Sequence, residues 1–558
     1  MKNNSKIFAI LTAGFMFSLT SCIDETFPES STATAEQVAA SPAGLAGALG
    51  GMSTAMCQGY YVYGGQTHET DMAYPAYMIA QTEMLSDLYP LGTNSGYDWY
   101  RSYNVASQDT RAFGSDSYFA YLPWFTFYKL IKTCNDVIGP VDLETETNPN
   151  VLQYVGSAYA SRAFQYYMLC VLYEPVKNQF TDCSAVLGSN PPSTALTVVK
   201  ILPETTKEEA KNNTRMTHDE AVEFMLSDLA KAEKCLANNE FKDRTAPTLA
   251  TVYGIMAKVY LWDEDYTNAA ECARKAIDLA GKPMTKTDWL DKNSAFSKAC
   301  DGWMWYLQYS AENMGNLCNF VGWISGEADW GYSSLTCPGI NKILYDKMGE
   351  NDFRRGAFLD PDRSVTLKYY DNNYSNMTSR DQAFIEDAPD YLALKFRCLD
   401  GNWEAYAIGG ASQVPVMRVE EMYFIEALAE GEKSVEKGVS LLNSFMTNYR
   451  DGGYSFSTGD KSEFEQELLT QMRIEFWGEG NAFPIAKRIG MDVLNNYEGT
   501  NAPADLFKVN YQGFKPSWTL CIPDYETQSN QVLASQNNPN PTGVTTYPTP
   551  IGEWATKK

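Results

Sequence analysis

Two neighbouring segments with helical periodicity, joined by a short polar turn, constrain the fold of this chain more than any other feature. In the first segment, Leu249, Val252, Met256 and Val259 recur at the spacing that places apolar side chains on one face of a helix. The second segment, 266–280, repeats alanine at a similar spacing. Because small side chains let helix axes approach closely, we expect the two segments to pack as a helical hairpin. The sequence therefore predicts a mainly α fold.

Other segments extend the helical pattern. Residues 154–173 are apolar on almost every side, which is typical of a buried helix, and Glu174-Pro175 should end it. Thr217 and Glu220 have the spacing of a capping box at the start of a further helix.

The hairpin at 249–280 resembles a tetratricopeptide repeat. Weaker helical hairpins are indicated at 119–173 and 417–449. A pure tetratricopeptide scaffold for protein partners would show several tandem copies with a period of about 34 residues. Only one copy is convincing here, so the pattern favours a different role.

The region 283–415 breaks the helical pattern. It is rich in Trp, Tyr, Gly, Asn and Asp, with helices expected only at about 338–348 and 380–387. The residues Trp303 to Tyr309 alternate as in a strand, which favours a place in the core. Long irregular segments in a compact domain are usually functional, and we expect the same here.

Composition excludes several classes of function. With 44 Lys+Arg against 69 Asp+Glu, the net charge of −25 argues against nucleic acid as a partner. The chain has only two histidines, His68 and His218, which excludes a multi-histidine zinc site. Its 12 cysteines form no C-x-x-C pair, which argues against a zinc ribbon or a thioredoxin-type motif.

The first 22 residues have the features of a bacterial lipoprotein signal. Lys2 and Lys6 precede an apolar stretch that is too short to span a membrane as a mature helix. The sequence Leu19-Thr20-Ser21-Cys22 is similar to a lipobox, in which Cys22 is lipidated and becomes the first mature residue. No later run of about 20 apolar residues exists, so we expect the lipid to be the membrane attachment.

These observations predict an order of parts. Residues 1–21 form the signal peptide, and 22–44 form the lipidated cysteine and a flexible tether. Residues 45–558 form a single domain, with an N-terminal helical part at 45–290 and a loop-rich C-terminal part at 291–558.

Several segments, in order along the chain, resemble the SusD/RagB family of outer-membrane nutrient-binding lipoproteins. The most specific match is Arg473-x-Glu475-Phe476, Glu479-Gly480 and Lys487-Arg488-x-Gly490, which is similar to the family pattern R-x-E-L-x-x-E-G-x-R-x-x-D-L-x-R-x-G. The other matches are Leu130–Ile138, Gly156–Ala163 with Leu172-Tyr173, Val414–Glu421, Leu442-Asn443, Ile522-Pro523 and Gln536–Pro539.

The chain departs from the family pattern at Ala482 and Ile485, where the family has an arginine and an aspartate. The resemblance implies a SusD-like α-helical fold with tetratricopeptide-like hairpins and a long irregular, aromatic-rich loop region. It further implies a non-enzymatic lipoprotein without a cofactor, held at the outer membrane through Cys22 and facing the cell exterior. Such a protein captures an oligosaccharide or polysaccharide, less often a peptide, and passes it to a SusC-like TonB-dependent transporter.

Two clusters match the chemistry of sugar binding, in which Trp and Tyr rings stack on apolar C–H faces while polar groups bind hydroxyls. The clusters lie at 83–101 and 319–332, where family ligand loops are expected. Each aromatic could instead belong to the core, and Asp87 could be a cap or turn residue. The candidate glycan-binding residues are Asp87, Tyr97, Trp99, Arg101, Trp323, Trp330 and Tyr332.

A catalytic alternative remains open. A surface glycoside hydrolase needs only a pair of carboxylates, and Glu475 and Glu479 are expected to share a helix face. We favour a structural role for this pair, in ion pairs with Arg473, Lys487 or Arg488. The segments Asp360-Pro361-Asp362 and Asp371-Asn372-Asn373 could hold a structural calcium ion, although neither matches an EF-hand loop.

Overall fold

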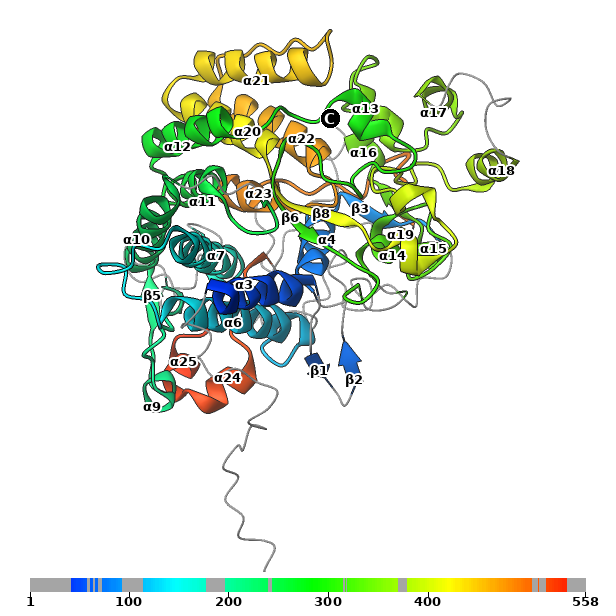
Figure 1. The fold of residues 1–558 in the computed structure, drawn as a ribbon. Helices are drawn as coiled ribbons and strands as arrows, with labels where there is room; N and C mark the ends of the chain where they lie inside the picture. Colours follow the sequence, from blue (N-terminus) through cyan, green and yellow to red (C-terminus); the bar gives the residue numbers. More distant parts are fainter. Residues whose placement is uncertain are drawn as a thin grey trace, which may run out of the picture.

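The fold is known from a computed structural model. It describes residues 42–57, 61–63, 66–68, 73–92, 114–176, 196–238, 243–314, 317, 319–369, 379–503, 510 and 518–538. Within these residues the chain is mainly helical, with short two-stranded sheets between the helices (Figure 1). The predicted fold class is therefore confirmed. The signal peptide and Cys22 lie outside the described residues, and the division into domains remains a prediction.

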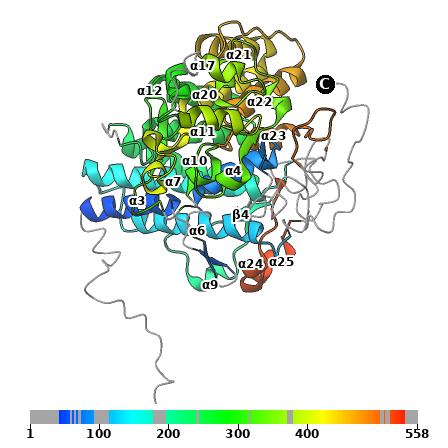
Figure 2. The same cartoon turned by 90° about the vertical axis from the view of Figure 1, so that its right-hand side faces the viewer.

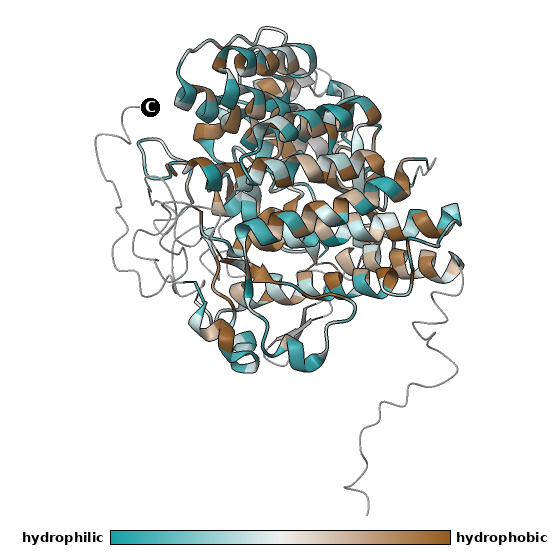
Figure 3. Ribbon diagram, turned by 90° about the vertical axis from the view of Figure 1, so that its left-hand side faces the viewer, coloured by the Kyte–Doolittle hydropathy of each residue, from teal (hydrophilic) through white to brown (hydrophobic). Residues whose placement is uncertain are grey.

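A stack of antiparallel helices forms one side of the molecule (Figures 1 and 2). Each helix packs against the next in the stack, and Figure 3 shows hydrophilic and hydrophobic residues alternating around many of them. In order, the helices are α3 (Pro42–Cys57), α6 (Tyr118–Ile138), α7 (Pro149–Tyr173), α10 (His218–Leu236), α11 (Leu249–Trp262), α12 (Tyr266–Leu279), α20 (Val419–Lys433) and α21 (Val435–Tyr449).

Helix α7 forms the centre of this stack. It begins at Pro149 after the N-cap Asn148, and it is buried almost continuously from Val155 to Tyr173. Gly156 permits close packing on α10, since an added Cβ would lie 2.8 Å from Cys235 Cβ and 2.9 Å from Leu236 Cγ. The prediction of a buried helix that ends before Glu174-Pro175 is confirmed.

The predicted hairpins are also present. Thr217 and Glu220 form the expected capping box at the start of α10. Helices α11 and α12 pack as the tetratricopeptide-like hairpin, and Asp265 caps α12 by accepting a hydrogen bond from the backbone N–H of Asn268. The pairs α6–α7 and α20–α21 correspond to the two weaker hairpins.

Polar groups surround the C-terminus of α7. Lys487 Nζ donates to the carbonyls of Val171 (2.7 Å) and Glu174 (2.8 Å). The Glu174 carboxylate lies 2.6 Å from His218 Nδ1, and His218 Nε2 lies 3.1 Å from Asp263. Burial lowers the pKa of Lys487 to about 7. Burial also opposes protonation of His218, but its hydrogen bonds with Asp263 and Glu174 prevail and raise its pKa to about 10.

Among the described residues there are four antiparallel two-stranded sheets, of which β3–β7 and β6–β8 join distant parts of the chain, and β6–β8 places Trp303 and Trp305 in the core as predicted. The strand pairs are β1 (Tyr61–Tyr63) with β2 (Gln66–His68), β3 (Leu88–Pro90) with β7 (Pro338–Ile340), β4 (Leu196–Val199) with β5 (Arg215–Thr217), and β6 (Trp303–Gln308) with β8 (Gln413–Arg418).

The predicted loop region contains more short elements than expected. A helix at 380–387 is confirmed as α18, whereas 338–348 divides into strand β7 and the short helix α16, because Asn341 caps α16 just after the strand. The elements of this region are α13 (Lys286–Leu290), α14 (Phe320–Ile324), α15 (Ser333–Thr336), α16 (Lys342–Tyr345), η4 (Phe353–Ala357), α17 (Ser364–Tyr369), α18 (Ser379–Asp387), η6 (Leu399–Gly401) and α19 (Tyr406–Gly409).

The remaining helices lie elsewhere in the chain, and one main apolar core extends from Leu45 to Leu533. Among the described residues, no helix combines the length and the apolar character needed to cross a bilayer. These helices are α4 (Tyr74–Met84), α9 (Lys207–Ala210), α22 (Lys461–Glu475), α23 (Phe483–Ile489), α24 (Asp524–Ser529) and α25 (Gln531–Ser535).

Candidate functional site

The described part of the 83–101 cluster, residues 83–92, lies beside the segment that follows the 319–332 cluster at the β3–β7 sheet. Beyond the paired strands, the N–H of Gly92 donates to the carbonyl of Thr336 (2.7 Å). Thr336 in turn lies one helical turn after Tyr332 and donates its N–H to the Tyr332 carbonyl (2.8 Å). The described end of the 83–101 cluster is therefore adjacent to the end of the 319–332 cluster. Tyr97, Trp99 and Arg101 lie outside the described residues, so their predicted role is untested.

The second cluster forms an ordered lobe around α14, α15 and α19, which we call the aromatic lobe (residues 319–336 and 398–410), at the right of Figure 1. Asn319 caps α14 by accepting from the N–H of Gly322 (2.9 Å). The rings of Trp323 and Tyr332 are in contact, with centroids 4.4 Å apart.

Trp330 belongs to a small apolar cluster with Val321, Ala328 and Cys398, and Trp403 packs against it. Glycine is required around this indole, because an added Cβ at Gly409 would lie 2.6 Å from Trp330 Cη2. Trp323 and Trp330 are only 6% and 7% exposed. Both indoles therefore support the lobe from inside, which is the core role that the sequence left open.

Two exposed residues of the same lobe were missed by the sequence-based reasoning. Tyr406 is 42% exposed and Ile408 is 50% exposed, on the short helix whose Gly409 packs against Trp330. Their segment, Trp403 to Gly410, has the same aromatic and glycine pattern as the two chosen clusters, and that signal could have identified it. Tyr406 is the aromatic of the lobe most accessible to a ligand in the described part of the chain.

Asp87 takes a structural position. Its carboxylate is 1% exposed and accepts from Arg473 of α22, with Nη2 2.5 Å from Oδ1. The Asp87 carbonyl also accepts from Trp477 Nε1 (2.8 Å) and from the N–H of Asn341 (3.0 Å). Asp87 thus fixes the start of β3 to the C-terminal helices, the alternative role that the sequence allowed.

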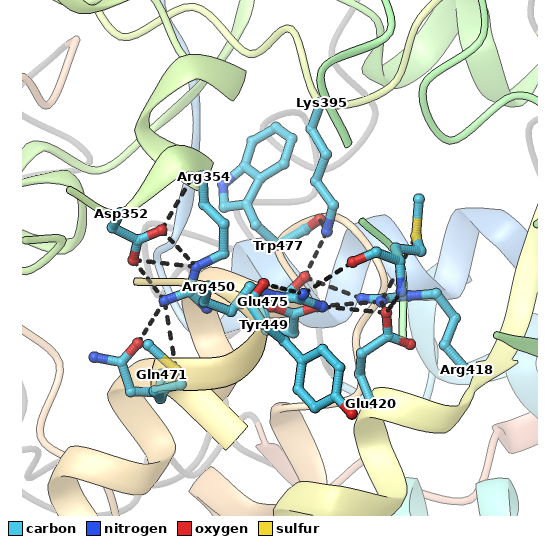
Figure 4. A network of polar contacts seen from close by, with 12 residues as sticks. Asp352, Arg354, Lys395, Arg418, Glu420, Tyr449, Arg450, Gln471, Glu475 and Trp477 are labelled. Carbon is cyan, nitrogen blue, oxygen red and sulfur yellow. Dashed lines mark hydrogen bonds and ion pairs between the residues drawn. The ribbon is translucent and has the colours of Figure 1, made fainter. Parts of the chain in front are cut away.

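Eight charged side chains form a second polar centre, shown in part in Figure 4, which we call the buried ion cluster. Each is at most 5% exposed, and the four positive charges balance the four negative charges. The members are Arg354, Lys395, Arg418, Arg450, Asp352, Glu420, Glu475 and Glu479.

Glu475 lies at the centre of this cluster. Its carboxylate accepts from Arg450 (2.7 and 2.8 Å), Arg418 (3.1 Å) and Arg354 (3.2 Å). Burial alone would raise its pKa, but the three arginines together hold the pKa of Glu475 well below its usual range. Glu479 binds Lys395 (2.6 Å) and Arg418 (2.8 Å).

The structure corrects the expectation for this carboxylate pair. Helix α22 ends at Glu475, because the chain turns at Gly478 and Gly480, both with a φ of +80°. Glu475 and Glu479 therefore do not share a helix face. The expected partners Arg473, Lys487 and Arg488 bind Asp87, the end of α7 and Glu432 instead. Both carboxylates are buried and held by cations, and the lowered pKa of Glu475 does not suit a glycosidase general acid, so the geometry favours a structural role for the pair.

Comparisons with known proteins agree with this architecture. A SusD-like family model, described as "Starch-binding associating with outer membrane", matches residues 71–261. The SusD-like protein P2 of Formosa agariphila is 27% identical over 259 residues, which span 44% of this chain and 46% of that relative. A SusD-like carbohydrate binding protein from Bacteroides vulgatus has the same fold, with a TM-score of 0.67, 17% identity, and coverage of 89% of this chain and 98% of that chain.

Residues 71–261 are thus similar to the SusD-like family, and the fold of the chain is that of SusD-like structures. A further neighbour of this SusD-like chain is the surface glycan-binding protein A from Bacteroides thetaiotaomicron, solved in complex with laminarihexaose. It has a TM-score of 0.59 and 15% identity, and the match covers 88% of this chain and 98% of that one.

The SusD-like signature near the C-terminus has a clear physical basis. Gly480 packs against α4, where an added Cβ would lie 2.6 Å from Gln81 Oε1, and its positive φ favours glycine. Glu479, immediately before it, enters the buried ion cluster. The absent arginine and aspartate of the family pattern are replaced by Ala482 and Ile485, which are both buried in the apolar core.

Proposed function

We propose that this SusD-like chain is a cell-surface lipoprotein that captures an oligosaccharide and delivers it, without catalysis, to a SusC-like TonB-dependent transporter. The observation that supports the proposal is the contact, at the β3–β7 sheet, between the described residues 88–92 and the end of the aromatic lobe. This arrangement joins Tyr406, Trp403 and the described aromatic lobe to the start of the segment that contains Tyr97, Trp99 and Arg101.

Several findings support a glycan as the ligand. The family model that matches residues 71–261 is described as starch-binding and associated with the outer membrane, and one structural neighbour was solved with laminarihexaose. The exposed ring of Tyr406 and the half-buried ring of Trp403, in a glycine-rich lobe, supply flat apolar surfaces on which sugar rings can stack. The anchor at Cys22 and the orientation toward the cell exterior are part of the proposal.

The proposal is tested by calorimetry on the chain from residue 23 onward, with a panel of oligosaccharides and peptides. We expect saturable binding of an oligosaccharide, and weaker binding in the Trp99→Ala and Tyr406→Ala variants but not in Gln528→Ala, a control on exposed α24. Chromatography of the incubated sugars should show no products. Turnover of any glycan would favour the hydrolase alternative, and binding of peptides alone would favour a peptide-binding member of the family.

A structural calcium ion remains a separate proposal. Asp360 is buried and accepts from the N–H of Thr366 (2.9 Å) and from its hydroxyl (2.8 Å), which caps α17, while Asp371-Asn372-Asn373 lie outside the described residues. Within the described residues, no three His, Cys, Asp or Glu side chains are grouped to hold a metal ion. Thermal unfolding with calcium and with a chelator would decide the question.

A further inference from the structure

A groove separate from the aromatic lobe lies between α16 and α22, which pack side by side (Figure 1). Its volume is about 460 Å³. This is within the range of small-molecule sites, which is about 300–1,000 Å³. The groove is lined by Ile343, Leu344, Lys347, Phe456, Asp460, Ser462, Glu463, Gln466, Glu467, Thr470, Arg473, Met491, Asp492 and Leu494.

The two walls of the α16–α22 groove differ in chemistry. One wall is aliphatic, with Ile343 of α16 and Leu494 partly exposed over the buried Leu344 and Met491. The opposite wall is a polar stripe along α22, and the Phe456 ring adds a flat apolar surface. The stripe lies along one side of the helix, with successive spacings of one or three residues, and consists of Glu463, Gln466, Glu467, Thr470 and Arg473.

The polar wall keeps unused hydrogen-bonding capacity. Glu467 Oε1 accepts from Tyr454 Oη (2.8 Å) and Gln471 Nε2 (2.9 Å), which leaves Oε2 available. Thr470 Oγ1 donates to the carbonyl of Gln466 (2.8 Å), so its lone pairs can still accept. Among the described residues, the side-chain amide of Gln466 has no hydrogen-bond partner, and Arg473 uses only Nε and Nη2 to hold Asp87.

The charges of the lining residues limit which class of ligand the α16–α22 groove can bind. The lining contains four carboxylates, Asp460, Glu463, Glu467 and Asp492, against the two cations Lys347 and Arg473. An anionic ligand would therefore meet net repulsion. A neutral molecule with one apolar face and several hydroxyls fits both walls.

We infer that the α16–α22 groove is a second saccharide site, which takes an uncharged sugar of one or two rings. The C–H face of a pyranose packs on the aliphatic wall and Phe456, while its hydroxyls bind Gln466, Glu467 and Thr470. Because the groove shares no residue with the aromatic lobe, this inference does not depend on the capture role proposed for the lobe.

Saturation-transfer NMR on the full chain tests the inference with four separate probes: maltose, cellobiose, laminaribiose and galacturonic acid. We expect at least one neutral disaccharide to give a saturable signal, and galacturonate to give none. The double variant Gln466→Ala/Thr470→Ala should raise the dissociation constant about tenfold, because it removes two hydrogen bonds to the ligand. Gln528→Ala is the matched control and should leave binding unchanged.

The two proposed sites can fail independently. If Tyr406→Ala abolishes all disaccharide binding while the Gln466→Ala/Thr470→Ala variant retains it, the lobe is the only site and the groove inference is overturned. The absence of a signal with every neutral disaccharide, or a signal that galacturonate reproduces, would overturn it as well. Circular dichroism melting curves of each variant establish that the fold is retained.

Discussion

The helical stack and the C-terminal region around α22 are held together in different ways. In the stack, α7 is buried along almost its whole length, and contacts such as Gly156 on Leu236 depend on volume. Around α22, Glu475 binds three arginines that come from distant points of the chain. The closest contacts of the first region are limited by side-chain volume, whereas the second region depends on particular charged partners. The two regions should therefore fail differently when they are mutated.

Removal of the central carboxylate should have the largest effect on stability. The variant Glu475→Ala leaves Arg354, Arg418 and Arg450 buried without their shared anion. Breaking a buried charge pair in this way costs about 3–5 kcal/mol of unfolding free energy. Equilibrium urea unfolding, followed by tryptophan fluorescence, measures the loss. Glu223→Ala on the exposed face of α10 is the control and should change stability by less than about 0.5 kcal/mol.

A similar loss in both variants would contradict the central role of Glu475, and so would a loss below about 1 kcal/mol in Glu475→Ala.

Two glycine substitutions test whether side-chain volume limits the packing of the helical stack. Gly156→Ala should destabilise by about 1–3 kcal/mol, because the new Cβ would overlap Cys235 and Leu236. Gly47→Ala, in α3, meets nothing within 4 Å and should stabilise the protein by up to about 1 kcal/mol through helix propensity. Thermal and urea unfolding of the two variants should therefore shift in opposite directions. Equal shifts of the unfolding midpoint in the two variants would mean that α7 can move to accommodate the added methyl group of Gly156→Ala.

The polar end of α7 gives a pH test with two opposing contributions. The pKa of Lys487 is lowered from 10.5 to about 7, so the unfolded chain binds this proton more strongly and stability rises with pH between these values. The pKa of His218 is raised from 6.5 to about 10, so its contribution is present below pH 6.5 and is lost as the pH rises through 10.

Variants separate these contributions. In Lys487→Met, the unfolding free energy should fall more steeply with rising pH than in the wild type. In His218→Asn, the unfolding free energy should instead rise with pH. In each variant the slope should change by at most about 1.4 kcal/mol per pH unit. Urea midpoints measured at intervals from pH 6 to 9 report both slopes. If the slopes of stability against pH match that of the wild type in both variants, neither Lys487 nor His218 changes its protonation between pH 6 and 9.

The smallest effect on stability is expected in the aromatic lobe. Tyr406→Ala removes a ring that is 42% exposed, so the unfolding free energy should change by less than about 0.5 kcal/mol. Glycan affinity should fall by about tenfold, since a stacked aromatic contributes of the order of 1 kcal/mol. Calorimetry and urea unfolding of the same sample test both statements. A large loss of stability with unchanged affinity would assign Tyr406 to the core.

The sequence predicted the helical stack well and the polar contacts poorly. The hairpins at 249–280 and 417–449 were predictable because periodicity and alanine content are local properties of the chain. The partners of Glu475 were not, since Arg354 and Arg418 lie 121 and 57 residues away along the chain. The burial of Trp330 was also beyond local reasoning, because it depends on Gly409 of another segment.

The buried ion cluster has a consequence for how the chain reaches its folded state. Arg354, Arg418 and Arg450 all precede Glu475 in the order of synthesis. A nascent or truncated chain that ends between residues 450 and 475 therefore contains all three arginines without the counter-ion that they share, and burying them costs free energy. The helical hairpins can form early and locally, but the complete ion cluster requires nearly the whole chain. Termination between residues 450 and 475 should yield a substrate for proteolysis instead of a smaller working protein.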